Sequence, residues 1–184
     1  IEKKLGYPCF VKPANAGSSV GITKAHNKEE LMEGLKVAAI HDSKIVVEEG
    51  IVGREIECAV LGNRGHVEAS CVGEIFSAGE FYDYDAKYNN AESKTVVPAE
   101  ISPEKQDEIR KMAVKVFNAV DGSGLARVDF FVENETENVI FNELNTLPGF
   151  TPISMYSMLW AACGKSTAEL LDNLIELALE RFSL

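Results

Sequence analysis

The sequence is poor in positive charge and contains no long apolar run. It has 18 Lys and Arg residues against 29 Asp and Glu residues, which gives a formal net charge of −11. Phosphate backbones and anionic membranes repel such a chain unless its cations gather in one place, so binding to nucleic acid or to a membrane surface is disfavoured. No apolar segment approaches the ~20 residues of a membrane-spanning helix, and none has the pattern of a signal peptide.

The sequence also lacks any close pair of cysteines. Its four cysteines are Cys9, Cys58, Cys71 and Cys163, and no two of them form a C-x-x-C motif. This spacing predicts small buried hydrophobic residues in the reducing cytoplasm rather than disulfides or a zinc site. The three histidines are equally scattered, and we assign no chemistry to them.

What the chain does have is the composition of an ordinary globular protein. Of its 184 residues, 46% are hydrophobic and 26% are charged, which suits one large domain or two small ones. Hydrophobic periodicity predicts a mixed α+β fold. The chain begins at Ile1 rather than at Met, and we interpret it as a fragment of a longer protein.

Turn residues and helix caps mark the expected elements. Strands are expected at residues 8–12, 44–49, 54–61, 66–72, 125–133 and 139–145. Helices are expected at 28–40 with Asn27 and Glu30 as a capping box, after Ser102, at 154–162, and after the capping box of Ser166 and Glu169. The helix after Ser102 has an apolar stripe of Ile109, Met112, Ala113, Val116, Phe117 and Val120. Residues 79–98 show no clear period and predict a long loop.

Two neighbouring strands near the end of the chain carry polar residues at alternate positions. A period of two places Arg127 and Asp129 on one face of the first strand, and Glu143 and Asn145 on one face of the second. The acidic and amide side chains supply only oxygen ligands, which Mg²⁺ prefers, and two carboxylates with substrate phosphates make a typical site. The pattern also allows a solvated polar face, or a salt bridge from Arg127 to one carboxylate.

The turn between these two strands predicts how their residues pair. If it closes symmetrically, Glu133 pairs with Val139, and Asp129 then lies opposite Glu143. The arginine likewise lies opposite the asparagine. Two carboxylates directly opposed across a ladder repel each other unless a positive charge lies between them, which favours the interpretation as a cation site.

Two loops and a turn add further candidates. Lys12 precedes the small residues 17–21, whose backbone N–H groups could approach an anion, although no Walker A motif is present and a plain strand–helix loop also fits. The turn at Gly149 follows the polar strand and could present an N–H to an oxyanion, and Ser154 begins a helix whose positive end could hold a carboxylate. A plain connector remains the alternative. Residues 81–88 are rich in tyrosine and predict either a hydrophobic patch under a lid or side chains that reach into a site when the lid closes.

The motifs, taken in their order, resemble the D-alanine–D-alanine ligases of the ATP-grasp superfamily. Those motifs are the strand–Lys–Pro segment, Gly-Ser-Ser-Val-Gly, the Glu-rich strand end, Phe-Tyr-Asp-Tyr-Asp-Ala-Lys-Tyr, Arg-Val-Asp and Asn-Glu-Leu-Asn-Thr-Leu-Pro-Gly. The likeness extends from Gly6 to the last helix. It implies the C-terminal portion of an ATP-grasp fold, in which two mixed α+β subdomains clasp ATP. Residues 1–50 would form part of the central subdomain, and residues 51–184 the C-terminal subdomain.

The resemblance also implies roles for individual residues. Nucleotide contacts are implied for Lys12 and Lys87 on the phosphates, Ser19 in the phosphate-covering loop, Glu48, Glu49 and Ile51 around the adenine, and Glu55 on the ribose. Two Mg²⁺ ions, for which Mn²⁺ could substitute, are implied at Asp129, Glu143 and Asn145. Catalytic roles are implied for Arg127 on the acyl phosphate, for the N–H of Gly149 on the oxyanion, and for Ser18 and Tyr88 in a latch that closes the lid. Ser154 and Met155 would hold the second D-alanine.

The implied activity is ATP-dependent ligation of two D-alanines through a D-alanyl phosphate, for peptidoglycan precursors. The alternatives are a D-alanyl-D-lactate or D-alanyl-D-serine ligase, or a nucleotide-binding module without catalysis. The family's amino-terminal domain and the first part of its central subdomain lie outside this sequence, so we expect little ligase activity from the chain alone. We expect a cytoplasmic homodimer for the parent enzyme.

Overall fold

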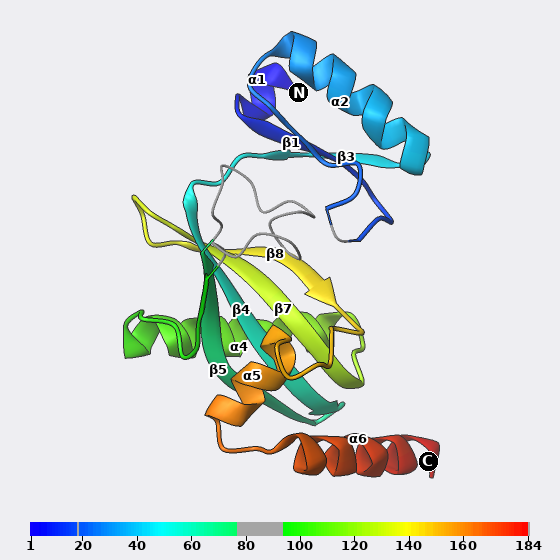
Figure 1. Cartoon of the computed structure of the whole chain (residues 1–184), viewed down its shortest axis with the longest axis vertical. Helices are drawn as coiled ribbons and strands as arrows, with labels where there is room; N and C mark the ends of the chain where they lie inside the picture. The colour runs from blue at the N-terminus through cyan, green and yellow to red at the C-terminus, as the bar shows by residue number, and fades with distance from the viewer. Residues whose placement is uncertain (18, 77–93, 184) are drawn as a thin grey trace. The chain divides into compact units, whose positions relative to one another are not determined.

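The computed structural model divides the chain into two compact units. The described residues are 1–17, 19–76 and 94–183. The first unit comprises Ile1–Val52 and Ser77–Lys94, and the second comprises Gly53–Phe76 and Thr95–Leu184. Each unit has its own sheet (Figure 1). The division after residue 52 lies two residues beyond the boundary that the sequence analysis places after residue 50.

The first unit is a three-stranded antiparallel sheet with a helix packed against it. The strands are β1 (Cys9–Pro13), β2 (Thr23–Ala25) and β3 (Ile45–Glu49), in the order β2-β1-β3, and the helices are α1 (Glu2–Leu5) and α2 (Lys28–His41). Alternation along β1 turns Cys9 and Val11 inward, where they pack with Leu31 of α2. Phe10 and Lys12 therefore lie on the face that α2 does not cover.

The cap of α2 is partly as predicted. The Oδ1 atom of Asn27 accepts a hydrogen bond from the N–H of Glu30 at 2.9 Å, which confirms Asn27 as the N-cap. The carboxylate of Glu30, however, accepts the N–H of His26 at 2.8 Å and not that of Asn27. The reciprocal half of the predicted capping box is therefore wrong, although a backbone donor near the helix start is still satisfied.

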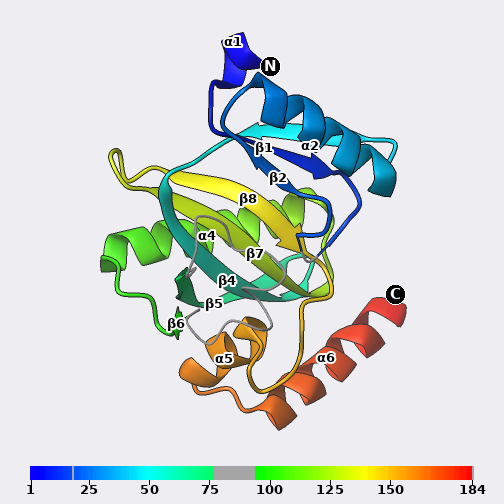
Figure 2. The ribbon, with the colours of Figure 1, turned by 45° about the horizontal axis from the view of Figure 1, so that its top comes forward.

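The second unit is a five-stranded sheet with helices on both faces. The strands are β4 (Gly53–Asn63), β5 (His66–Phe76), β6 (Lys94–Val96), β7 (Gly124–Glu133) and β8 (Val139–Asn145), in the order β6-β5-β4-β7-β8. Strands β5, β4, β7 and β8 pair antiparallel. The helices are α4 (Pro103–Ala119), α5 (Met155–Ala162) and α6 (Thr167–Phe182). Figure 2 shows α4 and α5 on opposite sides of this sheet.

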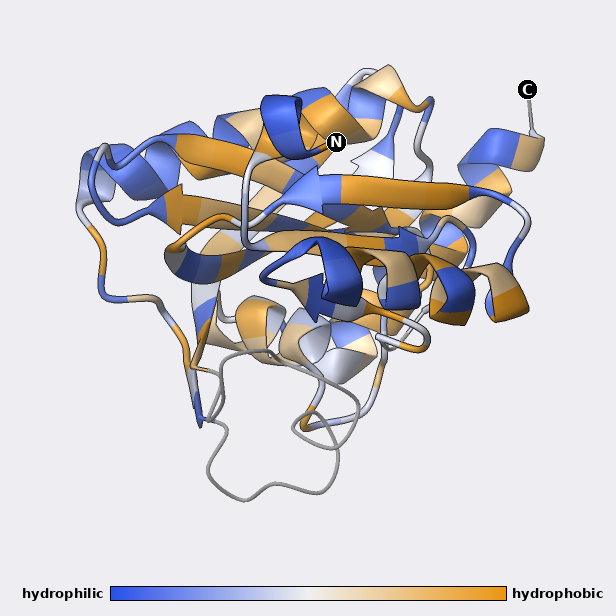
Figure 3. Cartoon of the chain, turned by 90° about the horizontal axis from the view of Figure 1, so that it is seen from above, coloured by the Kyte–Doolittle hydropathy of each residue, from blue (hydrophilic) through white to orange (hydrophobic). Residues whose placement is uncertain are grey.

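Two apolar clusters hold these layers together. On one face of the sheet, Ile56 and Val128 pack with Phe117 of α4. On the other face, Leu61 packs with Trp160 of α5. The helices carry both hydrophilic and hydrophobic residues, and several strands contain continuous hydrophobic stretches (Figure 3). Each buried large apolar side chain contributes about 1.5–3 kcal/mol to folding. No helix among the described residues is long and apolar enough to cross a bilayer.

Two local predictions are wrong, and one strand is missed. The strands β2 and β6 are not predicted, because three residues are too few to show a period, and β6 replaces part of the predicted loop at residues 79–98. The remainder of that loop up to residue 93 lies outside the described residues. Val120 is the C-cap of α4 and is 56% exposed, so it does not belong to the apolar stripe.

The cysteines also differ in part from the prediction. All four are free, and Cys9 and Cys58 are buried as expected. Cys71 is half-buried and Cys163 is exposed, so the prediction of burial is wrong for Cys163. These two residues are neighbours in space, since the N–H of Cys71 donates to the Sγ of Cys163 at 3.0 Å.

Candidate functional site

The polar residues of β7 and β8 meet on one face of the second unit. Asp129 pairs with Glu143 and Arg127 pairs with Asn145, which confirms the predicted register at this end of the ladder. Directly opposed residues of an antiparallel pair share a face, so all four side chains belong to the same surface. Val128 between them packs into the cluster under α4, which places the polar side chains on the opposite face.

A β-bulge produces this register. The predicted pairing of Glu133 with Val139 is wrong, because Val139 pairs with Val132. The register then shifts by one residue next to Asp129, where β8 has Asn142 as an extra residue. The shift at the turn and the shift at the bulge cancel, and the carboxylates therefore face each other as predicted.

Arg127 is tightly held by its neighbours. Its Nε donates to Oδ1 of Asp129 at 2.8 Å and its Nη2 donates to Oδ2 at 2.7 Å, while the side-chain amide of Asn145 donates to the same Oδ2 at 3.0 Å. The salt bridge that the sequence left open as an alternative is therefore present. Burial lowers the pKa of the guanidinium, but its hydrogen bonds to Asp129 and the charges of Glu57, Asp129 and Glu143 outweigh that effect and raise the pKa.

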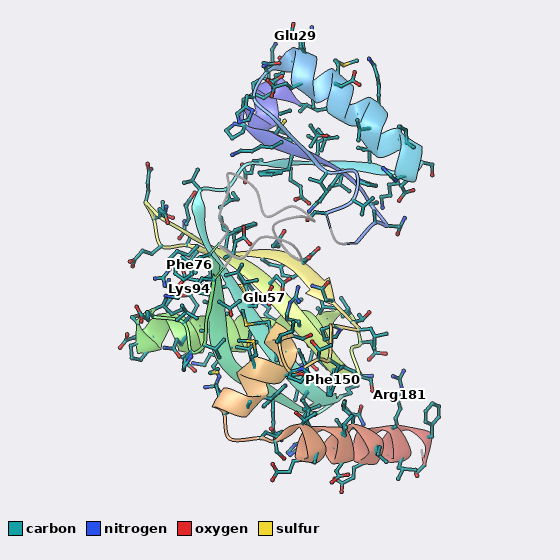
Figure 4. All side chains as sticks on the ribbon, in the orientation of Figure 1. Glu29, Glu57, Phe76, Lys94, Phe150 and Arg181 are labelled. Carbon is teal, nitrogen blue, oxygen red and sulfur yellow. The ribbon has the colours of Figure 1, made fainter. Side chains whose placement is uncertain are left out.

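Glu57 of β4 belongs to the same site, although no local sequence pattern predicts it there. It pairs with Asp129 across β4 and β7, is only 6% exposed, and has its Oε2 atom 3.0 Å from Nε of Arg127 (Figure 4 labels Glu57). The available signal is a glutamate between the apolar residues Ile56 and Cys58. Which strand lies beside β4 is a long-range property, and local periodicity does not reveal it.

The turn after β8 is organised by Ser154. Its Oγ accepts the N–H of Thr151 at 3.1 Å and lies 2.8 Å from the hydroxyl of the same residue. A Cβ atom on Gly149 would lie 2.8 Å from this Oγ, so a side chain at position 149 would displace the hydroxyl from its partners. Among the described residues, none accepts a hydrogen bond from the N–H of Gly149. That donor is thus available to a substrate oxygen.

Ser154 and Met155 begin α5. Ser154 is the N-cap residue, as predicted, but its hydroxyl makes no cap hydrogen bond. Met155 is 6% exposed and its side chain packs beside Leu159 and Gly73 in the core. A bound anion can therefore meet Met155 only through its backbone N–H, which is one of the free donors of the first helical turn.

In the first unit, Lys12 and Glu48 form an ion pair. The Nζ atom of Lys12 lies 2.6 Å from Oε2 of Glu48, and both side chains are partly exposed. Lys12 pairs with Val46 and Phe10 pairs with Glu48 across β1 and β3, so the two charged residues lie diagonally on the face that α2 leaves uncovered. A lysine and a glutamate two ladder positions apart can bind a nucleotide. The lysine can donate hydrogen bonds to a phosphate, and the glutamate can accept one from a purine amino group.

The loop after β1 is anchored at its base and sharply bent at its tip. Asn15 donates through its N–H at 2.9 Å and its side-chain amide at 2.7 Å to Oδ2 of Asp42. Ser19 has a φ of 60°, and Gly21 has a φ of 74° with the His41 ring 2.5 Å from where a Cβ would stand. Small residues are needed to bring backbone N–H groups close to an anion in such a loop.

The remaining predicted nucleotide residues lie around the end of β3 and the start of β4. Glu49 is exposed at the end of β3, and Ile51 is half-buried two residues later. Glu55 is half-buried in β4 of the second unit, where it pairs with Ile75 and Phe131. These positions are compatible with the implied roles, which stay predictions.

Three further predicted site residues lie outside the described residues. They are Ser18, which precedes the bent tip of the loop after β1, and Lys87 and Tyr88 of the tyrosine-rich segment. The prediction of a lid at residues 81–88 falls on the same undescribed part of the chain. The roles of all three residues stay predictions.

The donor chemistry of the second unit suits a hard divalent cation. Asp129 and Glu143 supply carboxylate oxygens, and Asn145 offers its amide oxygen, since its hydrogen bond to Asp129 uses the Nδ2 atom. The described residues contain no group of three or more His, Cys, Asp or Glu residues that could hold a metal. Two carboxylates and one amide leave room for substrate oxygens, which is how Mg²⁺ is usually bound beside phosphates.

A family model described as "D-ala D-ala ligase C-terminus" matches residues 1–176. The chain belongs to this family. Curated relatives named D-alanine–D-alanine ligase include that of Clostridium novyi (strain NT), 56% identical over 181 residues, and that of Acetivibrio thermocellus, 58% identical over 183 residues. The matched segments cover 98% and 100% of this chain and 52% and 48% of those proteins.

Solved structures agree with the family assignment. The VanG D-Ala:D-Ser ligase from Enterococcus faecalis is 42% identical with a TM-score of 0.87, over 96% of this chain and 51% of that one. The D-alanine-D-alanine ligase from Coxiella burnetii is 40% identical with a TM-score of 0.83, over 95% of this chain and 46% of that one. The predicted α+β ATP-grasp fold is thereby confirmed. The chain spans about half the length of the curated relatives that it matches.

Proposed function

We propose that this chain is the C-terminal part of an ATP-dependent ligase that joins two D-alanines for peptidoglycan precursors. The observation that supports the proposal best is the set of Arg127, Asp129, Glu143 and Asn145, which lie in register on one face of the sheet. A nucleotide-binding module that had lost catalysis would not need an arginine beside the cation ligands. Relatives with 56% and 58% identity are named D-alanine–D-alanine ligase.

The reaction has two steps that conserve all atoms. The carboxylate of the first D-alanine attacks the γ-phosphorus of ATP, which releases ADP and forms D-alanyl phosphate. The uncharged amine of the second D-alanine then attacks the acyl carbon, and inorganic phosphate and a proton leave. Both steps bring anions together, so catalysis depends on neutralising their charge.

The second unit supplies the groups for the reacting atoms. Arg127 stabilises the acyl phosphate and the tetrahedral intermediate, and the unused N–H of Gly149 donates to the oxyanion. The first turn of α5, at Ser154 and Met155, holds the carboxylate of the second D-alanine. Asp129, Glu143 and Asn145 would hold two Mg²⁺ ions, or Mn²⁺ in their place, which neutralise the phosphates.

The first unit supplies groups for the nucleotide. Lys12 contacts the phosphates, and the carboxylate of Glu48 accepts a hydrogen bond from the adenine amino group. Glu49 and Ile51 frame the adenine, while Ser19 and its neighbours cover the phosphates. The carboxylate of Glu55, which belongs to the second unit, accepts hydrogen bonds from the ribose hydroxyls.

Three phosphate and latch roles fall on residues outside the described part of the chain. Lys87 is assigned to the terminal phosphate of ATP, and Ser18 and Tyr88 to the latch that closes over the acyl phosphate. That intermediate hydrolyses in water, so a closing segment has a direct chemical purpose. These assignments rest on the family resemblance alone.

A second candidate function is ligation of D-alanine to D-serine. The solved VanG structure, at 42% identity, is titled a D-Ala:D-Ser ligase. The curated relatives at 56% and 58% identity are named for D-alanine. We therefore prefer the dipeptide of two D-alanines, which competition between D-alanine and D-serine in an assay of product formation would distinguish.

The proposal extends to the organisation of the parent enzyme. We assign residues 1–50 to the central ATP-grasp subdomain and residues 51–184 to the C-terminal subdomain. The resemblance favours a homodimer, and the use of ATP together with four free cysteines in the described structure favours the cytoplasm.

Calorimetric titration of the chain with ADP in the presence of Mg²⁺ tests the proposal. Binding is expected, and Glu143→Gln is expected to abolish it because a cation ligand is lost. Glu135→Gln is the matched control, since Glu135 is exposed in the turn between β7 and β8 and its replacement removes the same charge. Equal binding by the chain and by the Glu143→Gln variant would contradict the proposed site.

A further inference from the structure

Glu57 is a buried carboxylate for which the reaction just described has no role. It is 6% exposed at the middle of β4, in a row of three carboxylates formed by Glu57, Asp129 and Glu143 across β4, β7 and β8. A buried carboxylate is costly unless a cation compensates it. Among the described residues, Arg127 supplies such a cation, with 3.0 Å between its Nε and Oε2 of Glu57.

Arg127 therefore contacts two carboxylates, Asp129 and Glu57, and only Asp129 is proposed to bind the divalent cation. Asp129 holds the guanidinium through two hydrogen bonds of 2.8 and 2.7 Å, and Glu57 forms an ion pair with it from the neighbouring strand. Asp129 is also the residue whose oxygens are proposed to bind the cation. An arginine bound to Asp129 alone would compete with a divalent ion for the same two oxygens.

We propose that Glu57 is a positioning residue that retains Arg127 when Asp129 takes up the divalent cation. This inference rests on the proposed function. Glu57 offsets the charge of Arg127, so that Asp129 and Glu143 keep their attraction for the cation, and it keeps the guanidinium beside the reacting phosphate. Glu57 acts through Arg127 and not as a third cation ligand, in keeping with the absence of any three-carboxylate metal cluster among the described residues.

The test is Mn²⁺ binding to the full 184-residue chain, measured by the loss of the free-ion signal in electron paramagnetic resonance. Glu57→Gln is expected to weaken binding by about tenfold, a coupling of the size that neighbouring charged residues show. In the Arg127→Met background the same change is expected to weaken binding by less than about threefold, because the competing guanidinium is gone. Glu68→Gln removes an exposed carboxylate of β5 and serves as the control for charge alone.

A second variant at the same position distinguishes the length of the side chain from its charge. It also provides a test if Glu57→Gln fails to fold. Glu57→Asp keeps the charge but withdraws the carboxylate by one methylene, so it is expected to weaken Mn²⁺ binding to a similar extent in the presence of Arg127. Equal losses for Glu57→Gln with and without Arg127, or full binding by both Glu57 variants, would overturn the inference. Circular dichroism of each variant verifies the fold.

Failure of the proposed function gives a different pattern. If Asp129→Asn leaves Mn²⁺ binding unchanged, or if the unaltered chain binds no Mn²⁺, the cation site itself is wrong and the inference falls with it. If Asp129→Asn abolishes binding while Glu57→Gln has no effect, the cation site stands and only the role of Glu57 is wrong.

Discussion

A Cβ atom on Gly149 would lie 2.8 Å from the Oγ of Ser154, the hydroxyl that ties the turn after β8 to Thr151. Gly149→Ala must therefore rotate that hydroxyl away from its partners. We expect a loss of about 1 kcal/mol in the free energy of unfolding, as for one hydrogen bond. Urea denaturation measures it. In the Ser154→Ala background the same substitution should cost almost nothing, and simple additivity of the two changes would contradict the contact.

The buried carboxylate of Glu74 is expected to be essential for stability. It is 2% exposed and pairs with Arg54 through Nε at 2.7 Å and through a second, shorter contact at Nη2. Glu74→Gln leaves the guanidinium without its counter-charge, and we expect a loss of about 3 kcal/mol or more in the free energy of unfolding. Glu68→Gln, on the solvent-exposed part of the same strand, should change it by less than about 0.5 kcal/mol.

Ser157 offers the opposite case. Its Oγ is buried and has no hydrogen-bond partner among the described residues. Ser157→Ala removes an unsatisfied polar group and is expected to raise the free energy of unfolding by about 1 kcal/mol. Ser70→Ala is the contrasting variant, because the Oγ of Ser70 accepts the N–H of Ala59 at 3.0 Å and its loss should destabilise the protein. Thermal unfolding followed by calorimetry distinguishes the two signs.

The thiols are expected to react in order of exposure. Burial raises the pKa of Cys58 to about 12, and burial with a hydrogen bond to Cys163 raises that of Cys71 to about 12 as well. Because the thiolate is the reactive form, both should resist iodoacetamide at pH 8 while the exposed Cys163 is modified. Peptide mass spectrometry after timed labelling tests this order. Faster labelling of Cys58 than of Cys163 would contradict the burial described here.

Asp42 at the base of the loop after β1 is expected to titrate at low pH. Hydrogen bonds from the N–H of Lys44 and from Asn15 hold the pKa of this carboxyl below its ordinary value of 3.8. A carboxyl whose pKa is lower in the folded state stabilises the fold above its unfolded pKa and loses that contribution as the pH falls through the folded value. Carbon-13 chemical shifts of the Asp42 carboxyl should give a midpoint below 3.8, and a midpoint above it would contradict the anchoring.

Local patterns predict much of the fold and the centre of the site. The N-cap of α2 at Asn27, the capping box of α6 at Ser166 and the facing of Asp129 by Glu143 all follow from short-range rules. The last of these is right although Glu133 does not pair with Val139, because the bulge compensates the turn. Alternation decides the face of a residue more securely than it decides register.

What the sequence does not reveal depends on contacts between distant segments. Glu57 joins the site only because β4 pairs with β7, whose Asp129 lies 72 positions further along the chain. Cys71 and Cys163 are neighbours because α5 ends beside β5. Short-range periodicity carries no information on either pairing.

The extra residue Asn142 moves the odd-numbered positions of the seven-residue strand β8 from one face of the sheet to the other. Before it, Val139 and Phe141 are opposite the residues of β7 that pack under α4, and the Phe141 ring meets that of Phe130 edge-on at 6.1 Å. After it, Glu143 belongs to the polar surface. One inserted residue thus places Val139 and Phe141 on the side of the α4 cluster while Glu143 lies with the charged side chains of β7. With unbroken alternation Glu143 would share the face of Val139 and Phe141, and its carboxylate would turn toward α4 instead of lying beside Asp129.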